Sequence, residues 1–108
     1  MWSDEPFVRP DEVLFVLDYL GSPRATRARM AFLVAARYGR TRRPSLRALA
    51  RETGLSWQRV QQIINRGERL LRQPVRAAAW VILLERRPEI RGTKLYRATF
   101  PWQDARWP

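Results

Sequence analysis

Residues 45–66 read SLRALARETGLSWQRVQQIINR and divide into two short segments at Gly54. Ser45 and Ser56 precede the segments, and serine is a favoured residue at helix N-caps. Glycine commonly ends a helix because it takes the left-handed conformation without a Cβ penalty. Apolar and small residues recur at helical spacing in the two segments and just beyond them: Leu46, Leu49, Ala50, Val60, Ile63, Gly67, Leu70 and Leu71. The pattern predicts a helix-turn-helix over 45–66, with the second helix over about 56–73.

The polar side of the predicted second helix has an unusual composition. At about 100° per residue, six side chains share one arc of about 100°: Gln58, Gln61, Gln62, Asn65, Arg69 and Arg72. Surface helices usually mix acidic and basic residues, whereas this arc holds amides and arginines and no acid. An amide both donates and accepts, so Gln and Asn can bind an adenine edge in the major groove. The composition favours nucleic acid over two alternatives, a solvated helix face and a helical hairpin without a ligand.

Two groups of side chains are the candidates for contact with DNA. The base-reading candidates are Trp57, Gln58, Gln61, Gln62 and Asn65. The phosphate-binding candidates are Arg42, Arg43, Arg59, Arg66, Arg69 and Arg72. Trp57 stands at the start of the helix, where its ring can stack on a thymine methyl group or on a sugar. A further cluster at the start of the preceding helix, Arg24, Arg27 and Arg29, does not complement the helix dipole there and predicts an external anionic partner.

The run SLRALARETGLSWQRVQQIINRGERLLRQP resembles the C-terminal promoter-recognition domain, region 4, of bacterial sigma-70-type factors. The similarity covers roughly residues 27–75 and is strongest in LARETGLSWQRVQQI and RGERLLRQP. The resemblance implies a second helix that reads the promoter element near −35. It also implies neighbouring surfaces that bind RNA polymerase, through the β flap or another subunit, and upstream activators.

The resemblance comes with departures at the reading positions. By position, it places Trp57, Gln58, Gln61 and Gln62 where the family contacts bases and phosphates, and Gln62 matches in type. The family usually carries Arg, Glu and Arg where this chain has Trp57, Gln58 and Gln61. Loss of the acidic residue that reads cytosine argues against recognition of the standard promoter sequence. Because the other sigma regions do not fit in 108 residues, we expect a free-standing sigma-region-4-like protein rather than a complete sigma factor.

The charge of the chain favours the same class of partner. Net charge is +11 in 108 residues, a length typical of one domain with a small core. Residues 1–20 hold five acids and one arginine, whereas residues 22–51 hold nine arginines and no acid. A positive field of this kind draws phosphate polyanions such as double-stranded DNA and speeds their encounter.

Residue types that the chain lacks narrow the function. It has no cysteine and no histidine, which excludes disulfides, the usual zinc sites, thiol nucleophiles and histidine acid–base chemistry. No carboxylate pair, glycine-rich phosphate loop or nucleophile–base set is apparent, so we expect no enzyme, cofactor or metal. The amino end does not resemble a signal peptide, and the longest apolar run, 77–84, is far shorter than a membrane span. We expect a cytoplasmic protein that does not enter a membrane.

The remaining segments complete an all-α fold of about five helices. Three further helices are expected, over residues 11–20, 22–39 and 75–87. The second of them contains MAFLVAA at 30–36, apolar almost all round, which predicts the central buried helix. The last carries apolar residues that fit a core or a dimer surface: Trp80, Val81, Leu83 and Leu84.

The C-terminal segment is expected to differ in kind from the helical domain, residues 1–88. Residues 89–108 are interpreted as an extended arm, because TKLYRATF at 93–100 alternates loosely. The alternation places several residues on one side: Tyr96, Ala98, Phe100 and Trp102. Such an arm packs on its own domain, joins a partner protein or contacts nucleic acid.

Three functions fit these features. The leading hypothesis is a DNA-binding transcription regulator that acts near promoters with RNA polymerase. The alternative is a protein-interaction module that binds RNA polymerase or a sigma factor without sequence-specific DNA contact. The third is phage DNA packaging or plasmid partition, in which small helix-turn-helix subunits work as rings or dimers. The sequence does not distinguish a monomer from these oligomers.

Overall fold

A computed structural model describes residues 7–19, 25–38 and 44–99 of the chain. Its elements, in chain order, are α1 (Pro10–Leu17), α2 (Ala25–Arg37), α3 (Leu46–Thr53), α4 (Trp57–Leu71), η1 (Pro74–Arg76), α5 (Ala77–Arg86), η2 (Pro88–Gly92) and α6 (Lys94–Thr99), where η marks a 3-10 helix. These ranges contain no strand, so the expected all-α class is confirmed for them. None of their helices has both the length and the apolar character that crossing a membrane requires.

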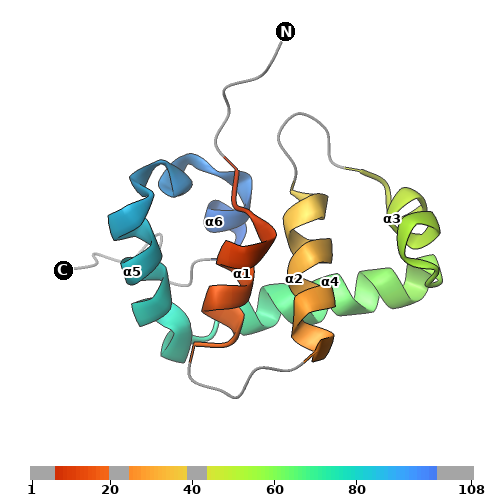
Figure 1. Ribbon diagram of the computed structural model, residues 1–108, viewed down its shortest axis with the longest axis horizontal. Helices are drawn as coiled ribbons and strands as arrows, with labels where there is room; N and C mark the ends of the chain where they lie inside the picture. Colours follow the sequence, from red (N-terminus) through yellow and green to blue (C-terminus); the bar gives the residue numbers. More distant parts are fainter. Residues whose placement is uncertain (1–6, 20–24, 39–43, 100–108) are drawn as a thin grey trace, which may run out of the picture.

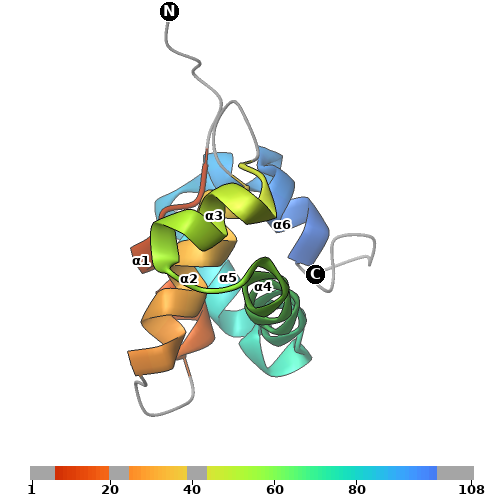
Figure 2. The same cartoon turned by 90° about the vertical axis from the view of Figure 1, so that its right-hand side faces the viewer.

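α4 is the longest of these helices, and the others are arranged around it (Figure 1). α1 packs on α2, α2 crosses α4, and α3 packs near the N-terminal end of α4. At the other end of α4, the chain passes through η1 into α5, which contacts α1. Figure 2 looks nearly along α4 and shows α1, α2 and α3 together on one side of it. The opposite side of α4 is left for solvent.

One buried cluster joins these elements. Its largest side chains include Trp80, Leu17, Leu33, Leu49, Leu71, Ile90 and Leu95. The indole N–H of Trp80 donates to the Leu71 carbonyl at 3.0 Å, and the Trp80 ring meets Tyr96 edge-on with centroids 5.6 Å apart. Trp80 of α5 therefore satisfies a carbonyl at the end of α4 while it fills the core.

The sequence predicts the presence of these helices better than their ends. α1 ends at Leu17 rather than at residue 20, and Asp18 is its C-cap. The helix expected over 75–87 divides into η1 and α5. In α2 the MAFLVAA segment is buried, as predicted, except at Phe32, which is 38% exposed, and at the half-buried Ala36.

The C-terminal segment differs from the expected extended arm. Residues 93–99 form α6 and its N-cap, and η2 precedes them, so the helical part continues past Pro88. The hydroxyl of Thr93 accepts a hydrogen bond from the Tyr96 N–H at 3.1 Å, which is N-cap geometry. The prediction of an arm is therefore wrong for these residues. Residues 100–108 lie outside the described ranges.

Packing explains why this segment is helical. The described buried residues of TKLYRATF follow helical spacing rather than strict alternation; they are Thr93, Leu95, Tyr96 and Thr99. Ala98, expected beside Tyr96, is exposed. A lone strand would leave its backbone groups without partners, whereas a helix bonds its own.

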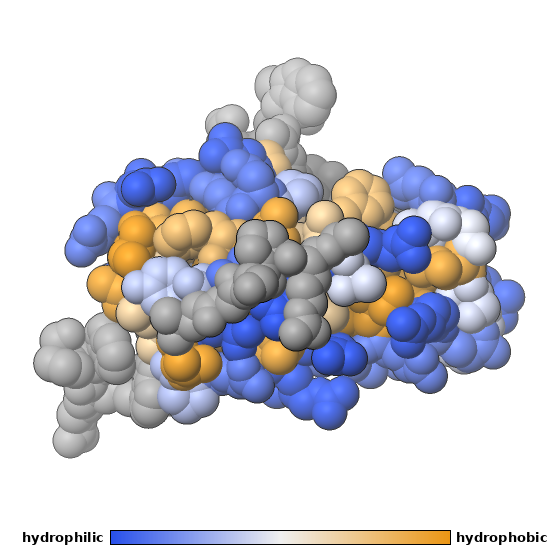
Figure 3. All heavy atoms as spheres, turned by 60° about the horizontal axis from the view of Figure 1, so that its bottom comes forward, coloured by the Kyte–Doolittle hydropathy of each residue, from blue (hydrophilic) through white to orange (hydrophobic). Residues whose placement is uncertain are grey.

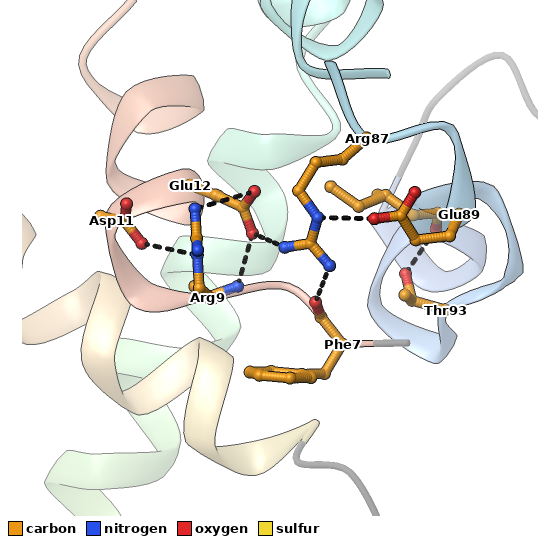
Figure 4. A network of polar contacts seen from close by, with 8 residues as sticks. Phe7, Arg9, Asp11, Glu12, Arg87, Glu89 and Thr93 are labelled. Carbon is orange, nitrogen blue, oxygen red and sulfur yellow. Dashed lines mark hydrogen bonds and ion pairs between the residues drawn. The ribbon is translucent and has the colours of Figure 1, made fainter. Parts of the chain in front are cut away.

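Arg87, which follows α5, joins the two ends of the described chain (Figure 4). Its Nη1 lies 2.5 Å from Glu12 Oε1, its Nε donates to Glu89 at 2.8 Å, and its Nη2 donates to the Phe7 carbonyl at 3.1 Å. Glu12 is only 6% exposed and also accepts from the Arg9 N–H at 2.9 Å, at the start of α1. We call these five residues the Arg87 network. It fixes α1 against the segment between α5 and η2.

The C-terminal end of α1 is bound by two arginines from other elements. Arg27 of α2 donates to the Leu17 carbonyl at 2.8 Å and lies 3.3 Å from the Asp18 carboxylate. Arg76 of η1 donates to the same carbonyl through Nε at 3.2 Å and Nη2 at 3.1 Å. Burial, followed by repulsion from Arg27, lowers the pKa of Arg76, and attraction to Asp18 opposes the shift. Because α1 has no basic residue in its own last turn, these cations offset the negative end of its dipole.

Candidate nucleic-acid interface

Three local signals fix the geometry of α3 and α4. The Ser45 hydroxyl accepts a hydrogen bond from the Ala48 N–H at 3.0 Å, and the Ser56 hydroxyl accepts one from the Arg59 N–H at 3.2 Å. Gly54 is left-handed, with φ of 75°, and its N–H donates to a carbonyl in the last turn of α3 at 2.8 Å. The predicted caps are thus confirmed at all three positions, and three residues separate α3 from α4.

The inner side of α4 determines how the helix sits on the core. Its buried residues are Val60, Ile64, Gly67 and Leu71. Ile63 and Leu70, which the sequence analysis placed on this side, are only half-buried, and Ile64 was missed. The reason is that α4 contacts α1, α2 and α6 together, so its buried stripe is centred on Ile64 rather than on Ile63.

Gly67 allows α2 to approach α4 closely. A Cβ at this position would lie 2.7 Å from Val34 Cγ2 and 2.9 Å from Met30 Cγ, well inside the contact distance of two carbon atoms. Val34 is fully buried and β-branched, so it has little freedom to move away. The crossing of α2 over α4 therefore depends on a residue without a side chain.

Four of the five base-reading candidates lie on the outer side of α4, and the fifth, Trp57, lies on its flank at the start of the helix. Gln58, Gln61, Gln62 and Asn65 are exposed, and Trp57 is 38% exposed. The centre of the arc of amides is roughly 140° around the helix from the buried stripe, at about 100° per residue. The structure therefore gathers these side chains on one solvent-facing surface. Their part in DNA binding stays a prediction.

Trp57 has a neighbour that the sequence analysis did not identify. The guanidinium carbon of Arg47, on α3, lies 5.9 Å from the centroid of the Trp57 ring. A cation over an aromatic face is attracted by the ring quadrupole. The contact orients the ring at the start of α4 and adds a positive charge beside the candidate reading surface.

Four of the six phosphate-binding candidates belong to the described residues, and all four are exposed: Arg59, Arg66, Arg69 and Arg72. Arg66 and Arg69 form no hydrogen bond or ion pair with the rest of the described chain, so their guanidinium groups face solvent. Arg42 and Arg43 lie outside the described residues.

The other two arginines have partners on α4 itself. Arg59 Nη1 donates to Gln62 Oε1 at 3.4 Å, and Arg72 Nη2 lies 3.7 Å from Glu68 Oε1. Glu68 was not considered in the sequence analysis because it falls outside the polar arc. Its carboxylate borders one flank of that arc and partly offsets the charge of Arg72, which makes Arg72 the weakest of the four phosphate-binding candidates.

No feature of the described chain suggests a metal centre at this surface. Within residues 7–19, 25–38 and 44–99, no three acidic, histidine or cysteine side chains lie together where they would hold a metal ion. The groups available at the outer side of α4 are amides, guanidinium groups and one indole. Their chemistry is hydrogen bonding, ion pairing and stacking.

A scan against protein-family models, a search of curated proteins and a search of solved structures each found no match for the chain. The resemblance to sigma region 4 therefore rests on the sequence motifs alone. Function has to be argued from the surface just described.

Proposed function

We propose that this protein binds double-stranded DNA through α4 and regulates transcription near promoters, together with RNA polymerase. The α3–α4 pair acts in this proposal as a helix-turn-helix. The observation that carries it is the outer side of α4, where four exposed amides and two exposed arginines share one arc with no acid. A solvated helix gains little from this composition, since the arc holds no acid and only Arg72 pairs with an opposite charge, on Glu68 beside the arc.

The dimensions of α4 suit the major groove. Its 15 residues span about 22 Å, and a helix of about 10–12 Å diameter fits a groove of about 12 Å. Residues 58, 61, 62 and 65 point outward over the first two turns and would meet base edges. An amide that bonds bidentately to adenine contributes about 1–3 kcal/mol of discrimination.

The flanking groups supply binding that does not depend on sequence. The arginines of α4, with Arg42 and Arg43, would bind phosphates. Trp57, held by Arg47, would stack on a thymine methyl group or a sugar. The net charge of +11 would speed encounter with DNA. In this proposal the protein is a cytoplasmic regulator without enzymatic activity or cofactor.

The experiment has two stages. Sites bound by the protein are first enriched from a random DNA pool, with and without RNA polymerase. Binding to the enriched site is then measured by fluorescence anisotropy over a salt series. We expect log affinity to fall linearly with log salt, with a slope of about −0.9 per phosphate contact.

The variants test which face binds. Gln61→Ala and Gln62→Ala should each weaken the enriched site by about 10- to 100-fold, and weaken random DNA far less. Arg86→Gln, at the exposed end of α5, removes one positive charge away from α4 and is the control. Salt-independent binding, or equal affinity of the glutamine variants and the parent, would overturn the proposal.

A second candidate function is an interaction module for RNA polymerase or a sigma factor. It is favoured by three aromatic side chains that are exposed in the described part of the chain: Phe15 at 37%, Phe32 at 38% and Trp57 at 38%. Exposed aromatic residues are enriched in protein interfaces. A variant with Gln58, Gln61 and Gln62 all changed to alanine, incubated with purified RNA polymerase, separates the two functions. If the variant still binds polymerase but no longer binds DNA, the interaction module is supported. If it still binds both, a surface other than the outer side of α4 binds the DNA.

A further inference from the structure

A groove lies between the first turns of α2 and the middle of α4. Its volume is about 430 Å³, and its lining residues are Thr26, Arg27, Arg29, Met30, Arg59, Gln62, Ile63, Arg66 and Leu70. Four of these nine residues are arginines, and none is acidic. Apolar side chains form the remainder of the wall with Thr26 and Gln62. Figure 3 shows the underside of the molecule, where broad apolar areas are bordered by hydrophilic residues.

The arginines that begin α2 divide into two kinds. Arg27 is turned inward, where it binds the Leu17 carbonyl and Asp18, so the prediction of an external anion is wrong for this residue. Arg29, two residues later, is exposed and forms no hydrogen bond or ion pair within the described ranges. Arg24 lies outside those ranges. Arg29 is therefore the α2 arginine available to a ligand in the groove.

The groove borders the candidate reading surface. Gln62 belongs to both, and Arg66 and Arg59 lie about 90–110° around α4 from the centre of the polar arc, at about 100° per residue. When a helix occupies the major groove, its outermost residues face base edges, and residues about 90° to each side face the two bordering phosphodiester strands. One of those strands would therefore pass over the α2–α4 groove.

The opposite flank of α4 is different. There Glu68 is paired with Arg72 at 3.7 Å, and Trp57 lies under Arg47. A carboxylate on this flank repels phosphate and reduces the number of free cations. The two DNA strands would therefore meet unequal surfaces. One surface has three arginines without an ion pair, Arg29, Arg59 and Arg66, whereas on the other Arg72 is paired with Glu68.

We infer that the α2–α4 groove binds one phosphodiester strand, through Arg29 of α2 together with Arg59 and Arg66 of α4. The Thr26 hydroxyl is a further donor, and Met30, Ile63 and Leu70 face the sugars. This inference rests on the proposed DNA binding and adds to it a residue outside the helix pair and an asymmetry between the strands. Arg29 acts as a positioning residue because a phosphate contact sets register without reading sequence.

The experiment compares two neighbouring arginines. Arg29→Gln should lower affinity about 5-fold near physiological salt, equally for the enriched site and for random DNA, and reduce the salt slope by about 0.9. Its melting temperature should match that of the parent. Arg27→Gln should lower the melting temperature and leave the salt slope unchanged when binding is measured well below it.

Neutral methylphosphonate linkages then identify the strand. When the linkages are placed on the strand next to the groove, the parent protein should bind more weakly. Arg29→Gln should then bind this modified DNA as tightly as the parent does. Placed at the equivalent phosphates of the other strand, they should leave the Arg29→Gln effect intact.

The outcomes separate this inference from the proposed function. If Gln61→Ala weakens binding but Arg29→Gln leaves affinity and salt slope unchanged, the groove does not hold DNA and only the inference fails. If the parent protein binds no DNA, the proposed function fails as well. If Arg29→Gln weakens binding to purified RNA polymerase and not to DNA, the groove binds an acidic protein surface and the inference is overturned.

Discussion

Arginine has different partners in two regions of this molecule. Around α1, the guanidinium groups of Arg27, Arg76 and Arg87 bind carbonyls and carboxylates of the protein itself. On α4, Arg66 and Arg69 are exposed and form no hydrogen bond or ion pair among the described residues. The first region uses the side chain to stabilise the fold. The second leaves the guanidinium groups exposed, although neighbouring positive charges repel one another. This arrangement is expected of a surface that binds a polyanion.

The pKa shifts follow this division. The hydrogen bond to Glu89, the largest cause, raises the pKa of Arg87 despite its partial burial. Burial lowers the pKa of Arg76. Substitutions around α1 should therefore change the free energy of unfolding, whereas substitutions on the outer side of α4 should change only binding.

The largest effect is expected at Arg87. Arg87→Met removes the closest partner of Glu12, whose side chain is 6% exposed. It should lower the free energy of unfolding by about 3 kcal/mol, because a buried carboxylate loses the closer of its two ion pairs and keeps only Arg9 at 3.6 Å. Urea denaturation monitored by tryptophan fluorescence provides the measurement. Arg86→Met, one residue earlier and exposed, is the matched control and should change stability by less than about 0.5 kcal/mol. Equal effects of the two variants would show that the Arg87 network does not stabilise the fold.

A smaller loss is expected where α2 crosses α4. Gly67→Ala places a Cβ against Val34 and Met30, and overpacking of this kind costs about 1–3 kcal/mol, against about 1 kcal/mol gained in helix propensity. We expect a net loss of up to about 2 kcal/mol in denaturant unfolding. Gly92→Ala, where no atom lies within 4 Å of the added Cβ, is the control. A stabilised Gly67→Ala protein would mean that the two helices separate easily.

The corner between α3 and α4 should respond through the backbone alone. Gly54→Ala forces a left-handed conformation on a residue with a Cβ, at about 1 kcal/mol, although nothing lies within 4 Å of the new atom. Gly54→Asn should lose less, since Asn tolerates this conformation. Thermal unfolding of the two variants tests the order. If alanine and asparagine cost the same, the loss has another origin than φ.

The Arg87 network should also give the unfolding free energy a dependence on pH. The hydrogen bond from Arg87 lowers the pKa of Glu89 below its ordinary value of 4.5. A carboxyl whose folded pKa is lowered contributes stability above its ordinary pKa, and that contribution is lost as the pH falls through the lower, folded pKa. Glu89→Gln should therefore flatten the acid limb of a stability–pH curve. Glu85→Gln, an exposed control on α5, should leave the limb as in the parent.

The smallest effect on stability is expected on the outer side of α4. Gln61→Ala and Gln62→Ala should change the free energy of unfolding by less than about 0.5 kcal/mol, because both side chains are exposed. Denaturant unfolding of the same preparations used for DNA binding checks this. A loss above 1 kcal/mol would place these amides in the fold rather than at a binding surface.

The features that the sequence predicts correctly are those set by residues close together along the chain. Ser45, Gly54 and Ser56 signal their caps within three or four residues, so the ends of α3 and the start of α4 are correct. The exposed polar side of α4 follows from its period alone. Strict alternation was the wrong period for residues 93–99, where packing against Trp80 favours a helix.

What was missed depends on distant contacts. Nothing near Arg27 or Arg29 reveals that only the first meets the Leu17 carbonyl, ten residues away on another helix. Arg87 and Glu12 are 75 residues apart, and no local pattern joins them. The groove beside α4 has the same origin, because it is formed by two helices whose crossing is set by Gly67.

The Leu17 carbonyl, which accepts hydrogen bonds from both Arg27 and Arg76, links α1 to the proposed affinity for DNA. It receives Arg27 from the start of α2 and Arg76 from just after α4, so a single oxygen ties the two sides of the groove to a third helix. Any substitution that shifts the last turn of α1 would move both arginines and alter the spacing between Arg29 and Arg66. In the proposed mode of DNA binding, substitutions in α1 would therefore change affinity although α1 does not line the groove.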